Sequence, residues 1–125
     1  MKTKVYIAGP MSGLPEFNRP AFHKMDVKLS NAGYAALNPA LLPDGLSQPE
    51  YMDICCAMLR CCDAILMLDG WDKSQGAVAE YHLAKKLGKQ IIPMANFNQF
   101  VVLNNPELFS KAIDETRELI FGKEV

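Results

Sequence analysis

The sequence predicts an α/β fold: a small Rossmann-like or flavodoxin-like sandwich, with a parallel sheet of four to five strands and helices on both faces. Short apolar segments bounded by glycine or proline alternate along the chain with amphipathic segments of helical spacing. Strands that alternate with helices in this way form parallel βαβ units with right-handed crossovers. The length of 125 residues suits one ordinary domain, so we expect a single domain over residues 1–125.

Residues typical of turns and helix ends bound the first expected strand and the first expected helix. Residues 3–8 alternate in polarity and then become apolar up to Gly9-Pro10, which is typical of a buried strand. Asn18 before Arg19-Pro20 predicts the start of a helix, and Gly33 predicts its end. Between these ends, apolar residues recur at helical spacing: Phe22, Met25, Leu29 and Ala32.

The next two elements follow the same alternation. Residues 34–37 predict a short second strand that Asn38-Pro39 ends. A loop rich in proline and glycine follows over residues 40–46. Ser47-Gln-Pro-Glu50 has the form of a capping box with proline in the first turn, so we expect a helix from there to Cys61.

The remaining chain predicts two more strands and two more helices. Residues 63–68 read as a third strand, and residues 90–94, beyond the helix that follows, read as a fourth. Residues 96–104 carry no pattern that assigns them. Asn105-Pro106 predicts the start of a last helix. Before Gly122 ends it, its apolar positions are expected to dock on the domain: Leu108, Phe109, Ala112, Ile113, Leu119 and Ile120.

Composition excludes several classes of partner. Lys and Arg number 13 against 14 Asp and Glu, which argues against a polymeric nucleic acid as partner. No apolar run is long enough to cross a bilayer, so we expect no membrane partner. Met1-Lys-Thr-Lys leads directly into a strand instead of a signal peptide's apolar region, so a cytoplasmic location is expected.

The four cysteines occur as two adjacent pairs, Cys55-Cys56 and Cys61-Cys62. Zinc ligands come with wider spacing and a second ligand cluster, whereas His23 and His82 stand alone. Adjacent cysteines also diverge on a helix. We therefore expect no metal, no disulfide and no cofactor, and interpret the cysteines as small apolar residues of the core.

One carboxylate, Glu80, interrupts the apolar stripe of the helix after the third strand. Residues three and four away share its face, and these are Gly76, Ala77, Leu83 and Ala84. A glutamate facing a sheet loses hydration, which is tolerated at a functional site. Glu80 would lie just past the carboxyl end of a parallel strand, where such sheets hold ligands. The alternatives are a side chain that bends back to a cap or the surface, or one that pairs with an arginine from a partner.

The segments Tyr6–Gly13 and Asp69–Glu80 are expected to face one another across one edge of the sheet and to form a pocket. Glycines in both segments let backbone approach a ligand, although a lone glycine more often serves a turn. The glycines concerned are Gly9, Gly13 and Gly76. Neither a dinucleotide fingerprint nor a Walker loop is present.

The motif Tyr6-Ile-Ala-Gly-Pro-Met-Ser-Gly13, together with Ser74-x-Gly76-x-x-x-Glu80, resembles the nucleoside 2-deoxyribosyltransferase superfamily. The closest likeness is to its small phage-type and bacterial branch of unknown function, which carries Tyr-Ile-Ala-Gly-Pro and Leu-x-Gly-Trp. The resemblance extends from the first strand through Gly88. Residues after Asn96 match only loosely.

The resemblance implies that Glu80 is a catalytic nucleophile and that Tyr6 orients it. Glu80 would attack the anomeric carbon of a deoxyribose to give a covalent glycosyl-enzyme, which water or a second base then resolves. Relatives that act on nucleoside monophosphates carry a phosphate-binding serine six residues before the nucleophile, where this chain has Ser74. Tyr6 as ordinary core and Ser74 as a helix cap remain open alternatives.

Further substrate-binding residues are expected around this pair. The loop would supply a cradle for phosphate or sugar, with Gly76 contributing backbone, while Trp71 and Met11 would offer surfaces to a base. Trp71 as a cover over the core is an equal alternative. The loop residues concerned are Gly9, Pro10, Met11, Ser12 and Gly13.

The sequence therefore predicts an N-glycosidase or deoxyribosyltransferase, a hydrolase or transferase acting on a 2′-deoxynucleoside 5′-monophosphate or nucleoside. One departure favours an alternative: relatives carry an aspartate that protonates the departing base, and this chain has Cys55 there. Asp53 lies two residues away and faces elsewhere on a helix, and Asp69 or Asp72 could substitute only if their loop folds inward. The alternative is a nucleotide-binding module without turnover. The resemblance also implies a homo-oligomer, a dimer or larger, with Phe97–Leu103 as a plausible contact.

Overall fold

The computed structural model of the protein describes the backbone of residues 1–121, and their side chains except those of Leu108, Phe109, Ala112 and Phe121. The chain falls into two compact units, one over Met1–Met94 and a second beginning at Ala95. The predicted helix end at Gly122 and the predicted docking of Leu108, Phe109 and Ala112 lie outside the described residues. The single domain over 1–125 and the docking of the last helix stay predictions.

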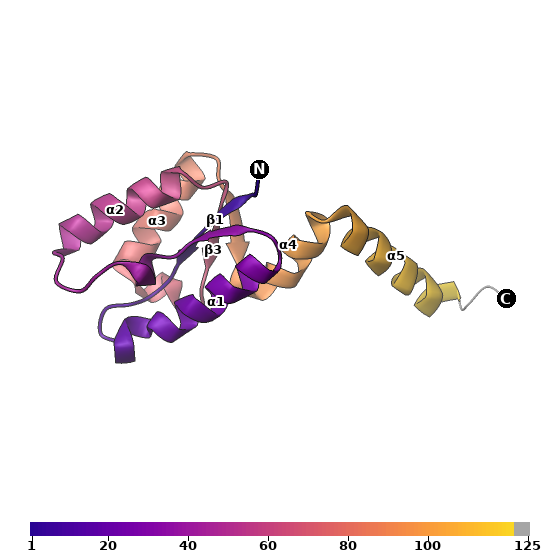
Figure 1. The fold of residues 1–125 in the computed structure, drawn as a ribbon, viewed down its shortest axis with the longest axis horizontal. Helices are drawn as coiled ribbons and strands as arrows, with labels where there is room; N and C mark the ends of the chain where they lie inside the picture. Colours follow the sequence, from indigo (N-terminus) through magenta and orange to yellow (C-terminus); the bar gives the residue numbers. More distant parts are fainter. Residues whose placement is uncertain (122–125) are drawn as a thin grey trace. The chain divides into compact units, whose positions relative to one another are not determined.

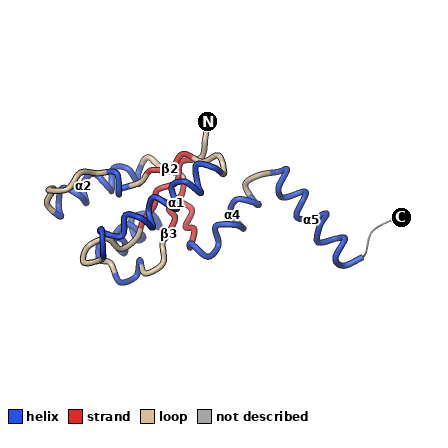
Figure 2. Tube along the Cα trace, turned by 60° about the horizontal axis from the view of Figure 1, so that its bottom comes forward, coloured by secondary structure: helices blue, strands red, loops and turns tan. Residues whose placement is uncertain are grey.

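The first unit is built on a four-stranded parallel sheet in the order β2-β1-β3-β4. The strands, red in Figure 2, lie side by side. β1 is central, and its Tyr6 is in register with Leu37 on one side and Ile65 on the other. The predicted α/β class with a parallel sheet is confirmed, with four strands. Their bounds are β1 Lys4–Ala8, β2 Ala35–Leu37, β3 Ala64–Met67 and β4 Gln90–Pro93.

Three helices cover this sheet: α1 over Arg19–Asn31, α2 over Gln48–Arg60 and α3 over Gln75–Lys86. Figure 1 shows α2 and α3 together on one face and α1 on the other. Short 3-10 turns join the elements: η1 Pro15–Asn18, η2 Pro39–Leu41, η3 Trp71–Lys73 and η4 Met94–Asn96. The second unit holds α4, Phe97–Leu103, and α5, Pro106–Phe121. The stretch 96–104 that the sequence left unassigned is therefore mostly helix.

Alternation along the strands divides the core between the two faces. Tyr6 and Ala8 of β1 join a cluster with Leu59 of α2 and Ala84 of α3. The intervening Val5 and Ile7 are equally buried and point to the opposite face, because successive strand residues alternate. On that face α1 buries its predicted stripe, Phe22, Met25 and Leu29. Within the described residues, no helix combines the length and apolarity needed to span a bilayer.

The predicted helix caps have different outcomes. At α2 the capping box is complete: Ser47 N–H donates to Glu50 Oε1 at 2.8 Å, and Glu50 N–H donates to Ser47 Oγ at 3.2 Å. At α1 the predicted start is confirmed, because the helix begins at Arg19 directly after Asn18. Asn18 precedes the helix, but its amide donates to the Pro10 carbonyl at 2.9 Å instead of capping the helix. Asn18 thereby ties the loop after β1 to the start of α1.

The turn before α1 is left-handed over three consecutive non-glycine residues. Glu16, Phe17 and Asn18 have φ values of 52°, 53° and 58°. Each such residue costs about 1–2 kcal/mol, because Cβ crowds the backbone oxygen. The arrangement persists because neighbouring contacts hold it, among them the Asn18 bond to Pro10.

The substitution Glu16→Gly is therefore expected to stabilise the protein. Glu16 is exposed, and glycine adopts the left-handed conformation without the steric cost of a Cβ. We expect a gain of roughly 1 kcal/mol in the free energy of unfolding, measured by urea denaturation. The matched control is Lys24→Gly, an exposed position inside right-handed α1, which should lose about 1 kcal/mol. Equal losses for both variants would contradict the left-handed conformation.

Candidate functional site

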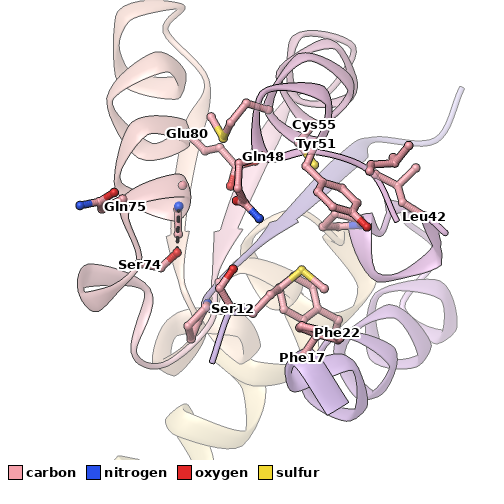
Figure 3. Close-up of a pocket in the computed structure, with 18 of the residues that line it drawn as sticks. Ser12, Phe17, Phe22, Leu42, Gln48, Tyr51, Cys55, Ser74, Gln75 and Glu80 are labelled. Carbon is pink, nitrogen blue, oxygen red and sulfur yellow. Dashed lines mark hydrogen bonds between the residues drawn. The ribbon is translucent and has the colours of Figure 1, made fainter. Parts of the chain in front are cut away.

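A cavity of about 570 Å³ opens at the carboxyl ends of β1 and β3. This volume is typical of small-molecule sites. Its walls come from the loop after β1, the start of α1, the segment after β2, one face of α2 and the start of α3 (Figure 3). Of the predicted site residues, it brings together Tyr6, Gly9, Pro10, Met11, Ser12, Ser74, Gly76 and Glu80.

Glu80 lies at the cavity wall and is buried, with 6% of its surface exposed. The hydroxyl of Tyr6, itself 1% exposed, donates a hydrogen bond to Glu80 Oε2. Among the described residues no ion pair joins Glu80 to a guanidinium; Arg19, which also lines the cavity, pairs with Asp44. The carboxylate is thus not free in solvent, no arginine of the described residues neutralises it, and it has open space beside it.

Burial determines the protonation of this pair. Loss of hydration raises the pKa of Glu80 from 4.5 to about 7, and the hydrogen bond from Tyr6 opposes that rise. Burial, and next the Glu80 charge, raise the pKa of Tyr6 well above its ordinary value. Tyr6 therefore stays a proton donor at neutral pH, while Glu80 is close to half ionised.

Cys55 lines the same cavity from α2, near Tyr6 and Glu80. Burial raises the pKa of its thiol, so Cys55 is neutral at physiological pH. The carboxylates considered as substitutes lie elsewhere. Asp53, Asp69 and Asp72 are exposed and do not line the cavity.

Ser74 both caps a helix and lines the cavity. Its Oγ accepts a hydrogen bond from Ala77 N–H at 3.3 Å, so the capping interpretation is confirmed. The hydroxyl keeps its own proton to donate, and the first N–H groups of α3 point towards the same end of the helix. Lys73 also lines this end. The arrangement suits an anionic group without requiring one.

Glycine occurs at the three positions singled out in the sequence for different structural reasons. A Cβ on Gly9 would lie 2.8 Å from the Leu68 Cβ, so packing requires glycine there. Gly13 has φ +81° and lies outside the cavity, so it serves a turn. At Gly76 a Cβ would meet nothing closer than Met52 Sδ at 3.6 Å. Gly76 is therefore the one whose missing side chain leaves room towards the cavity.

Trp71 does not lie in the cavity, contrary to the expected base-stacking role. Its ring packs against Tyr81 with centroids 4.7 Å apart, beside the core under α2 and α3. The aromatic lining comes instead from side chains that the sequence did not single out: Phe17, Phe22 and Tyr51. The contribution of α2 to this lining could have been predicted from the sequence. One face of α2 has the i, i+3, i+4, i+7 spacing and carries Gln48, Tyr51, Met52 and Cys55.

The cysteines are all unpaired, and Cys55 and Cys62 are buried in the core cluster. Within the described part of the chain, no three His, Cys, Asp or Glu side chains gather in a way that suits a metal ion.

Comparison with known proteins identifies the fold. The family model described as "Domain of unknown function (DUF4406)" matches residues 3–93. The structure of a 2-desoxiribosyltransferase from Leishmania mexicana superposes with a TM-score of 0.60 at 21% identity, over 73% of this chain. This chain spans 63% of that protein, less than two thirds of its length. The comparison with curated proteins gives no match. The predicted resemblance is thereby confirmed at the level of fold.

The raised pKa of Glu80 predicts a pH-dependent stability. Between pH 4.5 and 7 the unfolded chain releases this proton while the folded protein keeps it, so rising pH destabilises the fold and the loss levels off above pH 7. At 1.36 kcal/mol per unit, the full loss is about 3 kcal/mol. Glu80→Gln should lack this component.

Urea unfolding of both proteins from pH 4.5 to 8 measures the effect. The advantage of Glu80→Gln over the unsubstituted protein should grow with pH, while the other titrating groups cancel in the difference. A difference that stays constant across this range would show that Glu80 titrates normally.

Proposed function

Since the chain belongs to the DUF4406 family and shares its fold with a 2-deoxyribosyltransferase, we propose that it cleaves the bond between base and sugar in a 2′-deoxynucleoside 5′-monophosphate or nucleoside. The observation that carries the proposal is the buried Glu80 carboxylate, held by Tyr6 and facing a cavity of ligand size. A buried acid without a counter-ion is costly to keep, and such groups gather at functional sites.

In the proposed mechanism ionised Glu80 attacks the anomeric carbon. Tyr6 occupies Oε2, which leaves Oε1 to form the new C–O bond. The C–N bond breaks, its electron pair leaves with the base, and the sugar stays on Glu80 as an ester. Water then resolves the ester as a hydrolase would, or a second base as a transferase would. The low hydration of Glu80 favours attack, because little water must be displaced first.

The departing base needs a proton, and here Cys55 favours a second candidate function. A neutral thiol with a raised pKa is a poor acid at neutral pH. A missing general acid typically costs about 10²–10⁴ in rate. The second candidate is therefore a nucleotide-binding module that keeps the cavity without turnover.

The end of the cavity at α3 supports a phosphate on the substrate. Ser74 can donate its hydroxyl proton, free N–H groups begin α3, and Lys73 supplies positive charge. These groups favour a nucleoside monophosphate over a free nucleoside.

Turnover tests the proposal directly. Incubation with deoxynucleoside monophosphates should release free base, measured by chromatography, and Glu80→Gln should reduce release to the buffer background. Asp53→Asn removes an exposed carboxylate of the same unit and should leave release unchanged. Because Glu80 must be ionised, kcat/KM should rise with pH through an apparent pKa of about 7.

Two results would separate the candidates. A nucleotide that raises the melting temperature without any release of base supports the binding module. Release that persists in Glu80→Gln would refute the assigned nucleophile.

The phosphate assignment predicts a selective effect of Ser74→Asp. Aspartate is a good N-cap, so α3 and the fold should be preserved, while its charge repels a phosphate dianion. Monophosphate affinity, measured by calorimetry, should fall at least about tenfold, which corresponds to 1.4 kcal/mol, with nucleoside affinity little changed. Ser47→Asp, the same change at the cap of α2, is the matched control. Equal losses for both ligands would refute the phosphate assignment.

A further inference from the structure

A buried carboxamide lies directly after β2, outside the cavity. Asn38 is 2% exposed, and in the part of the chain that the structure describes Glu80 is the one other buried carboxylate or carboxamide. Burial of an amide costs free energy unless both its oxygen and its NH₂ group have partners. Glu80 lines the cavity, whereas Asn38 does not. The burial of Asn38 therefore needs an explanation other than contact with a ligand.

The side chain of Asn38 joins the segment after β2 to α1. Its Oδ1 accepts a hydrogen bond from Ala40 N–H at 2.9 Å, which fixes the orientation of the amide, because only the oxygen can face a donor. Its Nδ2 therefore faces α1, where it donates to Asp26 Oδ2 at 2.9 Å and lies 3.2 Å from His23 Nδ1. Ser30 donates to the other oxygen of Asp26 at 3.2 Å, so this carboxylate is held from both sides.

A helix cap alone would not require asparagine at position 38. Capping of the 3-10 turn η2 uses only the side-chain oxygen, which aspartate, serine or threonine would supply as well. Donation to Asp26 and His23 uses the NH₂ group, which asparagine has and those three residue types lack. The residue type at position 38 thus matches a junction with α1 in addition to a cap.

The segment that starts at this junction forms one wall of the cavity. We call residues 39–46 the wall segment, and its cavity-lining residues are Pro39, Leu42, Asp44, Gly45 and Leu46. Two further side-chain contacts hold it: Arg19 pairs with Asp44, and the Tyr51 hydroxyl donates to the Pro43 carbonyl at 2.6 Å. Both contacts are exposed, so water competes with them and their contribution is small. The bonds of the buried Asn38 are better shielded from water.

We propose that Asn38 is a positioning residue whose amide locks the wall segment to α1, so that the cavity is formed before a ligand enters. The inference rests on the proposed function, because the nucleotide of that proposal is the ligand for which the wall is prepared. Tyr6 and Glu80 come from β1 and α3 instead. Loss of the lock should therefore lower the fraction of molecules that are ready to bind, which raises KM in proportion and leaves kcat unchanged.

Asn38→Asp tests the lock. The new carboxylate keeps the bond from Ala40 N–H, but it presents an acceptor to Asp26 where the amide presented a donor. KM for a deoxynucleoside monophosphate, measured by base release, should rise about tenfold, and kcat should change less than about twofold. Backbone amides of the wall segment should exchange hydrogen faster, measured by mass spectrometry. Asn31→Asp, the same change at an exposed position of α1, is the matched control and should alter none of these values.

Two more variants separate the lock from folding. Asp26→Ala keeps Asn38 and its cap, and alanine suits a helix, so KM and the exchange rate of the wall segment should rise even if Asn38→Asp does not fold. The double variant Asp26→Asn with Asn38→Asp exchanges the amide and the carboxylate, so a donor again faces an acceptor across the junction. It should return KM to within about threefold of the unsubstituted value, because neighbouring sites couple.

The outcomes separate the inference from the function on which it rests. If the unsubstituted protein binds no nucleotide and releases no base, the proposed function fails. Hydrogen exchange then decides the lock: faster exchange of the wall segment in Asp26→Ala supports it, and unchanged exchange overturns it. If base is released, the inference alone is overturned when the variants lower the melting temperature without raising KM, or when the double variant restores nothing.

Discussion

The structure depends on the burial of one carboxylate beside one phenol. Tyr6 sits in the central strand with Glu80 on the helix that crosses its carboxyl end, so the hydrogen bond between them joins β1 to α3 at the cavity. A carboxylate without this donor would face the full cost of dehydration. Burial raises the pKa values of both groups, and the gap between them keeps the proton on Tyr6. The donor and the acceptor therefore keep fixed roles at neutral pH.

The polar part of the site could be predicted from the sequence because it is local. Tyr6 and the loop after it form one segment, and Ser74, Gly76 and Glu80 form another, each a strand end that runs into a helix. Parallel topology alone brings two such ends together. The capping box of α2 was equally readable, since its partners are three residues apart. Structural features that depend on neighbouring residues in the sequence, or on the periodicity of one helix or strand, could therefore be predicted.

The interactions that the sequence did not reveal concern side chains whose neighbours come from distant segments. Asn18 precedes α1 as predicted, but its amide bonds to the Pro10 carbonyl of the loop after β1. Trp71 had the chemistry to stack on a base, yet Tyr81 supplied a ring on the core side. The aromatic lining of the cavity was missed for the same reason. Its three rings, those of Phe17, Phe22 and Tyr51, come from separate elements, and Phe17 lies in a left-handed turn that contains no glycine.

The neutral Cys55 thiol helps to explain why Glu80 can ionise near neutral pH. A second carboxylate at this position would add a buried negative charge beside Tyr6 and Glu80, and like charges raise the pKa of an acid. With a neutral thiol, burial is the principal cause of the shift, and Glu80 still ionises near neutrality. Under the proposed mechanism, a thiol at this position gives up protonation of the leaving group in favour of an ionised nucleophile. Under the proposed mechanism, selectivity then moves to the base itself, because a base that leaves readily without a proton loses least.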